Sequence, residues 1–385
     1  MAIKKTKEEQ LVIQYLNKLG LKAYKNNRQF WDDIKRRYDK DLLKKLNDEM
    51  KTPSSSLYAL KNSSLQLSLD VSKISADLYR KFFDWFALRG KAPKKILDVG
   101  CDNGIVTCFL ATLYPEAEVI GIDKQPEAID CAKELAQKCN LSNVSFLNLD
   151  IGQALTQFEK QSFDLIVSLS VFHEVFNLQT PRYWSVEELL EMDEPTLDQS
   201  TLMNLRILLQ NHSESEFVTC ERLPFMGAVA VWTKALTSSG FHIQWDQTQY
   251  LHFHELGEQQ KMPIIVAKTQ NNVELLEKVY AFESKDKVLS YFDGKIFREP
   301  EAEIVLEQVP NKELLIGSQI DFSNDSGSMR IECWKTEGNI FLYQYSNIGY
   351  RELKVFDIKN LEKAIAEFEQ LNLKWAPHGT TTIYE

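Results

Sequence analysis

The residues of this chain with the clearest chemical potential follow short apolar segments that read as strands. Residues 94–110 read KKILDVGCDNGIVTCFL, in which an apolar run, the turn GCDNG and an apolar helix start follow one another. Gly100 lets the backbone turn where a β-carbon would clash, and Gly104 allows close approach of the helix and a ligand. A helix that starts directly after such a turn presents free N–H groups to a polar ligand. The stretch therefore predicts the first strand–turn–helix unit of a nucleotide-binding sheet.

Acidic residues end the two predicted strands that come next. Residues 118–123 read EVIGID and end in Asp123, about 20 residues beyond the turn, where a carboxylate accepts hydrogen bonds from ribose hydroxyls. Residues 144–150 read VSFLNLD and end in Asp150. Both acids are expected at the carboxyl edge of a parallel sheet, beside the glycine turn.

A histidine and a glutamate follow the fourth predicted strand, residues 163–168 (FDLIVS). His173 and Glu174 lie in the sequence VFHEVF, at the edge where open α/β sheets bind their ligands. One interpretation is that they form a general base, or an orienting pair, that acts on a hydroxyl or amine group of a substrate. The other is that His173 packs over a bound ligand or caps a helix, and the sequence leaves both open.

In their order, ILDVGCDNG, VIGID, NLD and FDLIVSLSVFHEV resemble the class I S-adenosylmethionine-dependent methyltransferases, over about residues 92–268. The resemblance implies an α/β fold with a Rossmann-like, doubly wound sheet of seven strands, the last two of which form an antiparallel pair. It also implies S-adenosyl-L-methionine as the cofactor, because the ordered motifs are specific for the cofactor and poorly specific for the acceptor.

The same resemblance assigns roles to individual residues. Gly100, Cys101 and Gly104 would line the methionine part of the cofactor, and Asp98 would act through the turn or on the cofactor's amino group. The residues assigned to the remaining parts are Asp123 at the ribose with Lys124 next to it, Asp150 and Ile151 at the adenine, and Ser168 beside the sulfonium.

Asp102 departs from the family pattern because it occupies the place of the middle glycine. A carboxylate is tolerated beside a sulfonium and an ammonium, but a pyrophosphate would repel it. The departure therefore argues against a dinucleotide and leaves the backbone geometry of the turn open.

A third group of polar residues lies in the predicted loop 246–262, between the sixth and seventh strands of the family fold. His252, His254 and Glu255 have the spacing H-x-H-E, in which alternate residues of an extended chain share a face. Two histidines alone make a weak metal site. The sequence favours a polar loop from which one histidine reaches the acceptor, with His254 as the candidate and the choice between it, His252 and His173 as the base left open. Methyl transfer from a sulfonium requires no metal.

Two further segments are candidates for the acceptor side of the site. Residues 177–200 are long for a connection and predict a lid or specificity element, unless they form a surface insertion without a role. After the fifth predicted strand, residues 215–222, the side chains of Phe225, Met226 and Trp232 either wall an apolar pocket or belong to the core.

The predicted organisation has three parts: a helical region over residues 1–90, the methyltransferase domain over 91–269 and an α+β domain over 270–385. In the first part, helices are expected over residues 11–19, ending at Gly20, and over 29–50 and 77–88. In the last part, alternating apolar runs from residue 303 onward predict an antiparallel sheet, and residues 359–371 predict a helix. Residues 329–375 faintly resemble WGR-type domains, although the Trp-Gly-Arg triplet is missing.

Composition and charge narrow the class of protein. The 385 residues are 44% apolar and 26% charged, as in ordinary globular proteins. The start is not a secretory signal, no apolar run reaches membrane-spanning length and the six cysteines lack CxxC spacing, so we expect a cytoplasmic protein with free thiols. The net charge of -10 conceals 19 Lys and Arg against 11 Asp and Glu in the first 90 residues. This basic excess is either a solvated helical surface or a region that holds an acidic substrate or nucleic acid.

The predicted reaction is transfer of a methyl group to an oxygen or nitrogen nucleophile. The N–P–P–Tyr signature of amino-methylating DNA and RNA enzymes is absent after FDLIVS, and Cys220 lacks the Pro-Cys context of cytosine C5 enzymes, which favours a small-molecule acceptor. A nucleic-acid acceptor held by the basic N-terminal region and a non-catalytic cofactor-binding scaffold remain alternatives. We expect no membrane partner, and assembly into a homo-oligomer through the C-terminal domain is left open.

Overall fold

The chain is divided into two compact units in a computed structural model. Its described residues are 6–51, 55–158, 162–176, 199–209, 215–223, 226–268, 292–298, 300–323, 327–347 and 350–384. The first unit comprises residues 1–177, 196–222 and 235–272, and the second comprises 178–195, 223–234 and 273–385. The N-terminal helices and the predicted methyltransferase sheet therefore lie in one unit, and each unit is described by itself.

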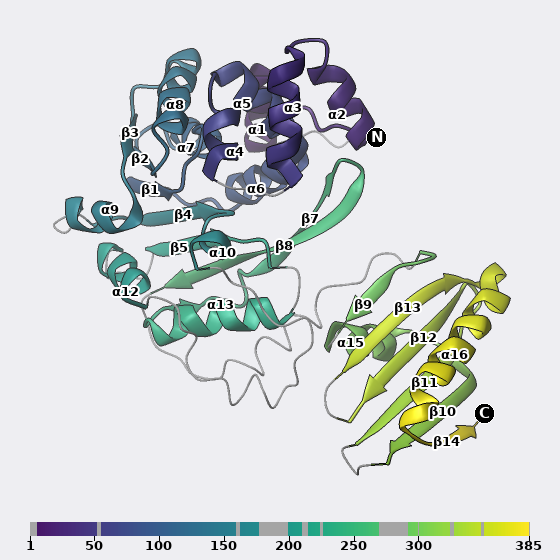
Figure 1. Ribbon diagram of the computed structural model, residues 1–385. Coiled ribbons are helices and arrows are strands. Elements are labelled where there is room, and N and C mark those ends of the chain that lie inside the picture. Colours follow the sequence, from purple (N-terminus) through teal and green to yellow (C-terminus); the bar gives the residue numbers. More distant parts are fainter. Residues whose placement is uncertain are drawn as a thin grey trace. The chain divides into compact units, whose positions relative to one another are not determined.

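The first unit is built around an eight-stranded sheet (Figure 1). Its strands are β1 Lys95–Val99, β2 Glu118–Asp123, β3 Val144–Asn148, β4 Leu165–Leu169, β5 Glu216–Cys220, β6 His242–Ile243, β7 Gln249–Glu255 and β8 Glu258–Lys268. The order is β3-β2-β1-β4-β5-β8-β6, with β7 paired to β8. Strands β1 to β5 are parallel, and β8 is antiparallel to β5, β6 and β7. The predicted doubly wound α/β fold is confirmed, and the strand order reverses between β1 and β4, where such sheets bind ligands.

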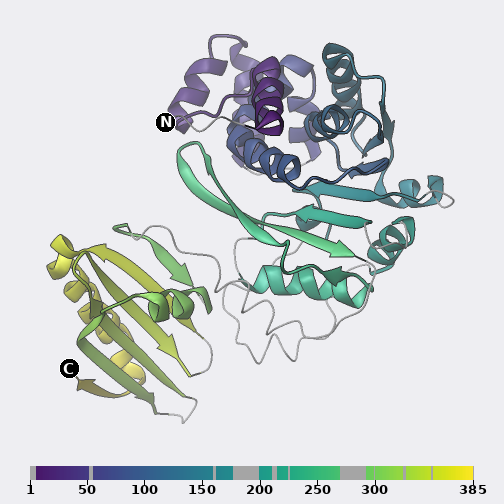
Figure 2. The same ribbon diagram turned by 180° about the vertical axis from the view of Figure 1, so that it is seen from behind.

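The predicted loop over residues 246–262 is wrong, because residues 249–262 belong to the β7–β8 hairpin. Leu251 and Phe253 are buried in the core while the residues between them are more exposed, which is the alternation of a half-buried strand. Leu256 and Gly257 turn the chain with positive φ values of 51° and 90°. The hairpin reaches from the sheet toward the N-terminal helices (Figures 1 and 2), and a β-carbon on Gly257 would collide with the carbonyl oxygen of Lys25.

The helices of the first unit precede or connect the strands. They are α1 Lys7–Leu19, α2 Asn27–Ile34, α3 Lys40–Lys51, α4 Ser55–Lys61, α5 Leu65–Ser72, η1 Lys73–Ser75, α6 Ala76–Leu88, α7 Ile105–Leu113, α8 Pro126–Cys139, α9 Ile151–Gln157, α10 Phe172–Val175 and α12 Gln199–Leu208. Helix α13, Met226–Ser238, continues across the boundary between the units. Helix α1 ends at Gly20 in the left-handed conformation, as predicted.

The helix predicted over residues 29–50 is broken into α2 and α3. The side chain of Asp39 accepts hydrogen bonds from the backbone N–H groups of Asp41 and Leu42 at 3.0 and 2.9 Å. An acid that satisfies the first free N–H groups starts a new helix, and apolar periodicity alone does not reveal such a break.

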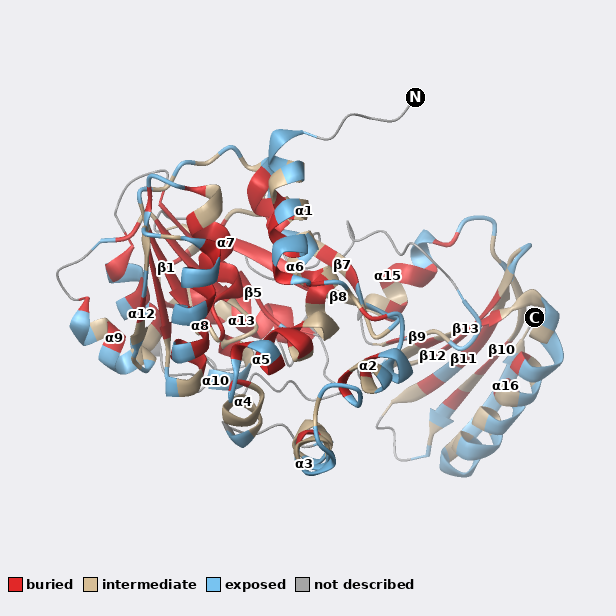
Figure 3. Ribbon diagram, turned by 90° about the horizontal axis from the view of Figure 1, so that it is seen from above, coloured by how far each residue is buried: buried red, intermediate tan, exposed pale blue. Residues whose placement is uncertain are grey.

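The N-terminal helices share a core with the sheet, whose strands are largely buried (Figure 3). Phe83 of α6 stacks on Phe109 of α7 with ring centroids 3.9 Å apart. The hydroxyl of Tyr15 in α1 donates to the carbonyl oxygen of Ile105, the first residue of α7, at 2.7 Å. The region that the sequence separates as N-terminal is thus packed against the helix that follows the glycine turn.

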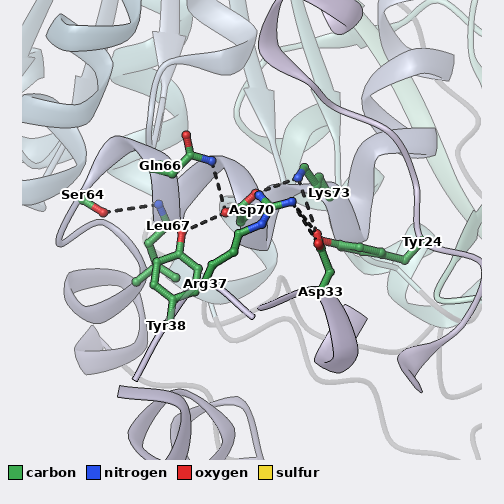
Figure 4. A network of polar contacts seen from close by, with 9 residues as sticks. All are labelled: Tyr24, Asp33, Arg37, Tyr38, Ser64, Gln66, Leu67, Asp70 and Lys73. Atoms are coloured by element: carbon green, nitrogen blue, oxygen red, sulfur yellow. Dashed lines mark hydrogen bonds and ion pairs between the residues drawn. The ribbon is translucent and has the colours of Figure 1, made fainter. Parts of the chain in front are cut away.

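A buried carboxylate ties the turn that follows α2 to α5 (Figure 4). The Asp70 side chain is fully buried and accepts hydrogen bonds from Arg37, Lys73, Tyr38 and Gln66 at 2.7 to 3.2 Å. Burial alone would raise the pKa of Asp70, but these hydrogen bonds and the charge of Lys73 outweigh it and hold the pKa below its usual value.

The second unit contains a six-stranded antiparallel sheet of order β14-β10-β11-β12-β13-β9. Its elements are β9 Ile296–Arg298, α15 Pro300–Gln308, β10 Glu313–Phe322, β11 Ser328–Lys335, β12 Asn339–Ser346, β13 Arg351–Asp357, η2 Ile358–Asn360, α16 Leu361–Trp375, η3 Ala376–His378 and β14 Gly379–Tyr384. Two clusters of buried residues join α15 and α16 to the sheet. The predicted antiparallel α+β domain is confirmed, although the apolar run at residues 303–309 lies mainly in helix α15. The WGR likeness and assembly through this domain stay predictions.

The cysteines and the apolarity of the helices bear on the class of protein. All six cysteines are buried and none forms a disulfide. Within the described part of the chain, no helix has the length and apolarity needed to cross a bilayer.

Candidate functional site

The glycine turn between β1 and α7 has the strained backbone that its glycines indicate. Gly100, Asp102 and Gly104 have φ values of 70°, 48° and 79°. A β-carbon on Gly100 would lie 2.5 Å from a methyl carbon of Val171, and one on Gly104 would lie 2.8 Å from the β-carbon of Ala132. Gly104 therefore lets α8 pack closely, and its assignment to the cofactor, like that of Cys101, stays a prediction.

Asp123, at the end of β2, holds the turn in place. One carboxylate oxygen accepts from the N–H of Asp102 at 2.9 Å and the other from the N–H of Gln125 at 2.9 Å. Burial raises the pKa of Asp123 above its usual value, with the two backbone hydrogen bonds acting in the opposite direction. Each carboxylate oxygen retains acceptor capacity for a ribose hydroxyl. Lys124 beside it is exposed.

Asp98 lies beneath the turn and not at its surface. It is 2% exposed and accepts a hydrogen bond from the hydroxyl of Thr107 in α7 at 2.6 Å. Burial raises the pKa of Asp98 to about 7. Of its two predicted roles, the contact with α7 favours action through the turn.

Asp150 and Ile151 stand next to the end of β2, at the start of α9. Strand β3 ends at Asn148, opposite Asp123 in the sheet, so the predicted strand end at Asp150 is two residues too long. The Asp150 carboxylate accepts from the N–H of Gln153 at 2.7 Å and caps α9. Its side chain is exposed, and its assignment to the adenine, like that of Ile151, stays a prediction.

Glu221, the residue after β5, is the centre of the polar contacts at the end of β4. Its side chain is fully buried, and one oxygen accepts from the hydroxyls of Ser168 at 2.9 Å and Thr219 at 3.0 Å. The other oxygen accepts from the N–H groups of Val171 and His173 and lies 2.8 Å from Nδ1 of His173. Ser168 is thus buried under Glu221, and its predicted place beside the sulfonium stays a prediction.

The contact with Glu221 determines which nitrogen of His173 can act as a base. When Glu221 is ionised, its carboxylate only accepts hydrogen bonds, and Nδ1 of His173 then carries the hydrogen. The lone pair of the neutral ring then lies on Nε2. Nε2 is 4.0 Å from Glu174, whose oxygen accepts a hydrogen bond from the Tyr58 hydroxyl at 2.6 Å. The predicted pair of His173 and Glu174 is therefore supplemented by Glu221, which the sequence interpretation missed.

His254 contacts helix α6. It is on β7 with 64% of its side chain exposed, and its Nδ1 is 3.8 Å from Asp77 of α6. Its neighbour Glu255 pairs with Arg222 at 2.7 and 3.0 Å and accepts from Ser75 at 2.6 Å. No cluster of three His, Cys, Asp or Glu side chains suited to a metal ion occurs within the described ranges.

Several predictions for the acceptor side fall outside the described residues. This concerns residues 177–198 of the predicted lid and Phe225 of the predicted pocket. Trp232, in α13, is fully buried.

The residues at this edge fit S-adenosylmethionine. Ser170, between β4 and α10, has φ 60° and a buried hydroxyl without a hydrogen-bond partner among the residues that the structure describes. A buried hydroxyl of this kind requires a partner, which a bound ligand at the edge can supply. The acids Asp123 and Asp150 offer acceptors for a ribose and an adenine amino group.

Comparison with known proteins identifies the core. Residues 91–195 match the family model described as a methyltransferase domain. The relatives include a malonyl-(acyl-carrier protein) O-methyltransferase of Acetivibrio thermocellus, 34% identical over 26% of this chain and 34% of the relative. The release factor glutamine methyltransferase of Escherichia coli is 36% identical over 20% of this chain and 26% of the relative. A ribosomal RNA large subunit methyltransferase G of Psychromonas ingrahamii is 32% identical over 24% of each chain.

The match spans about a third or less of the length of each of these relatives. The chain carries a class I S-adenosylmethionine-dependent methyltransferase core, so the predicted family and its cofactor are confirmed. The names of the relatives cover an acyl carrier protein, a protein and an RNA, so they do not fix the acceptor.

Proposed function

We propose that this protein transfers a methyl group to an oxygen or nitrogen of a small-molecule acceptor, with His173 as the general base. The contact of 2.8 Å between His173 Nδ1 and Glu221 carries the proposal, because it leaves Nε2 as the basic nitrogen at the ligand edge. When bound, S-adenosylmethionine supplies a methyl group on a sulfonium, which is an activated leaving group. The task of the protein is then alignment of the acceptor and removal of its proton.

The residues of the chain divide this task. The glycine turn, Asp123 and Asp150 hold and orient the cofactor. His173 Nε2 accepts the proton of the acceptor hydroxyl or amine, and the buried carboxylate of Glu221 stabilises the imidazolium that results. A base positioned in this way contributes about 10²–10⁴-fold to a rate.

A small molecule is the acceptor that the sequence at the end of β4 favours. The residues after β4 read SVFHEV where amino-methylating DNA and RNA enzymes have N–P–P–Tyr. A nucleic-acid acceptor is the alternative, and the excess of 19 basic over 11 acidic residues in the first 90 positions supports it. Binding of tRNA that weakens steeply with salt would favour this alternative.

Calorimetric titration of the full chain with S-adenosylmethionine and S-adenosylhomocysteine tests the proposal first. We expect micromolar binding that Asp123→Ala abolishes and Asp130→Ala, an exposed acid on α8, leaves unchanged. Absence of binding by the folded wild-type protein would contradict the proposal. Binding without turnover over a panel of hydroxyl and amine acceptors would favour a non-catalytic scaffold.

A further inference from the structure

Asp102, the acid in place of the family's middle glycine, has two partners from the N-terminal region. The Lys61 ammonium lies 2.6 Å from one of its oxygens, and the Asn62 side-chain amide donates to the other at 2.7 Å. Lys61 and Asp102 are 14% and 24% exposed in their side chains, so the ion pair is largely screened from water. The extra charge of the turn is therefore matched by an equal and opposite charge at the end of α4.

A buried polar network fixes the position of this pair. Asn62 accepts from the hydroxyl of Ser68 at 2.5 Å, and Asn103 in the glycine turn donates to Ser68 at 2.7 Å and to Ser72 at 3.0 Å. These four side chains are at most 7% exposed. A satisfied buried network is rigid, so Asn62 and the neighbouring Lys61 are held at the turn.

Helix α4 also contacts the loop after β4, through Tyr58. The Lys61 ammonium lies 4.9 Å from the ring centroid of Tyr58, which is hydrogen-bonded to Glu174 of α10. Helix α4 therefore connects the loop after β1 with the loop after β4. Those are the two strands between which the sheet order reverses and a ligand is bound.

The opposite charges of Lys61 and Asp102 at the glycine turn suit a zwitterionic ligand. If Asp123 holds the ribose, the remainder of the cofactor extends to the glycine turn, and that remainder bears a carboxylate and an ammonium. An ammonium such as Lys61 has three donors and one is used by Asp102, while each Asp102 oxygen can accept a second hydrogen bond. Asp102 and Lys61 thus retain bonding capacity of opposite sign.

We propose that Lys61 binds the carboxylate of the amino-acid end of S-adenosylmethionine, and that Asp102 binds its ammonium. The proposal rests on the proposed cofactor site and extends it to the N-terminal region. Asp102 is then a specificity residue that, with Lys61, selects a zwitterionic amino-acid end.

Calorimetry with two probes tests this role of Lys61. S-Adenosylhomocysteine carries the amino-acid end, and 5′-methylthioadenosine lacks it. We expect Lys61→Met to weaken S-adenosylhomocysteine roughly 10–100-fold, the loss of a charge-assisted hydrogen bond, and to leave 5′-methylthioadenosine unchanged. Lys45→Met, an exposed lysine of α3, is the matched control. Equal weakening of both probes, or of neither, would overturn the proposal.

A double variant separates direct binding from charge neutralisation. If Lys61 only neutralises Asp102, then Lys61→Met combined with Asp102→Asn regains wild-type affinity for S-adenosylhomocysteine. If Lys61 binds the carboxylate, the affinity stays low, as we expect. Recovery would contradict the proposal.

Hydrogen exchange of the wild-type protein needs no variant that must fold. S-Adenosylhomocysteine should protect the amides of residues 55–62, and 5′-methylthioadenosine should not. Equal protection by both would contradict the role of Lys61. Failure of the wild-type protein to bind either probe would instead contradict the proposed function.

Discussion

Two buried carboxylates in the first unit have different kinds of partner. Asp70 contacts the cations Arg37 and Lys73, whereas Glu221 contacts hydroxyls, backbone N–H groups and His173. Permanent cations beside Asp70 keep it ionised and join the turn that follows α2 to α5, which is a contribution to stability. The partner of Glu221 is a histidine, the side chain that most often serves as a general acid or base in catalysis. The identity of the partner, and not burial, distinguishes the two sites.

The largest effect is expected from His173→Gln. The variant lacks the basic nitrogen, so methyl transfer to the acceptor found by screening should slow by about 10²–10⁴-fold. Affinity for S-adenosylhomocysteine should change less than about twofold, since His173 is not assigned to cofactor binding. A rate within about threefold of wild type would remove His173 from the mechanism.

Asp70→Ala should reduce stability and not the rate per folded molecule. Removing the acid leaves Arg37 and Lys73 uncompensated, and we expect a loss of about 3 kcal/mol, at the lower end for a broken buried pair because Arg37 reaches solvent. Urea unfolding measures this loss in the free energy of unfolding. Asp32→Ala, which breaks the exposed pair with Arg28, is the control and should cost less than about 1 kcal/mol. Equal losses in the two variants would show that the Asp70 contacts have no special weight.

The pH dependence of stability should separate Asp98 from Asp70. The folded-state pKa of Asp98 is raised to about 7, so its contribution to stability is present below its unfolded pKa and is lost as pH rises through about 7. The folded-state pKa of Asp70 is lowered, so its contribution is present above the unfolded pKa and is lost as pH falls through the folded value.

Thermal unfolding between about pH 4 and pH 7 checks the first of these signs. Asp98→Asn should flatten the decrease in stability toward neutral pH. Asp70→Asn should lower the stability at neutral pH and flatten the loss of stability on the acid side. An unchanged slope in Asp98→Asn would mean that this carboxyl does not titrate in that range.

The smallest effect is expected from Glu174→Gln. Glu174 is half exposed and 4.0 Å from His173, and glutamine can still accept the hydrogen bond of Tyr58. The rate should change less than about fivefold, in line with exposed ion pairs. A loss as large as that of His173→Gln would make Glu174, and not Glu221, the partner of the base.

The parts of the fold and site that the sequence predicts depend on local patterns. The turn GCDNG, the strand ending in Asp123 and the helix ending at Gly20 each follow from residues close together in the chain. The sequence predicts Asp150 at the edge where β2 and β3 end. The strand itself ends two residues earlier, because Asp150 caps helix α9.

The contacts that could not be predicted join residues far apart in the chain. Glu221 and His173 are 48 positions apart, and Lys61 and Asp102 are 41 apart. A pattern of neighbours carries no information on such pairs. Glu221 had one usable signal, because it directly follows β5, the strand next to β4, and acids at the ends of parallel strands meet at one edge of the sheet.

The burial of every cysteine gives the molecule built-in reporters of local opening. Burial raises the pKa of Cys131 and of Cys333 to about 11, so neither thiol forms the reactive thiolate in the folded state. Cys333 belongs to the sheet of the second unit and Cys131 to α8 of the first. Alkylation of each thiol should then require that its own unit opens, so the labelling rates at the two positions measure the kinetic stability of the two units separately in one sample.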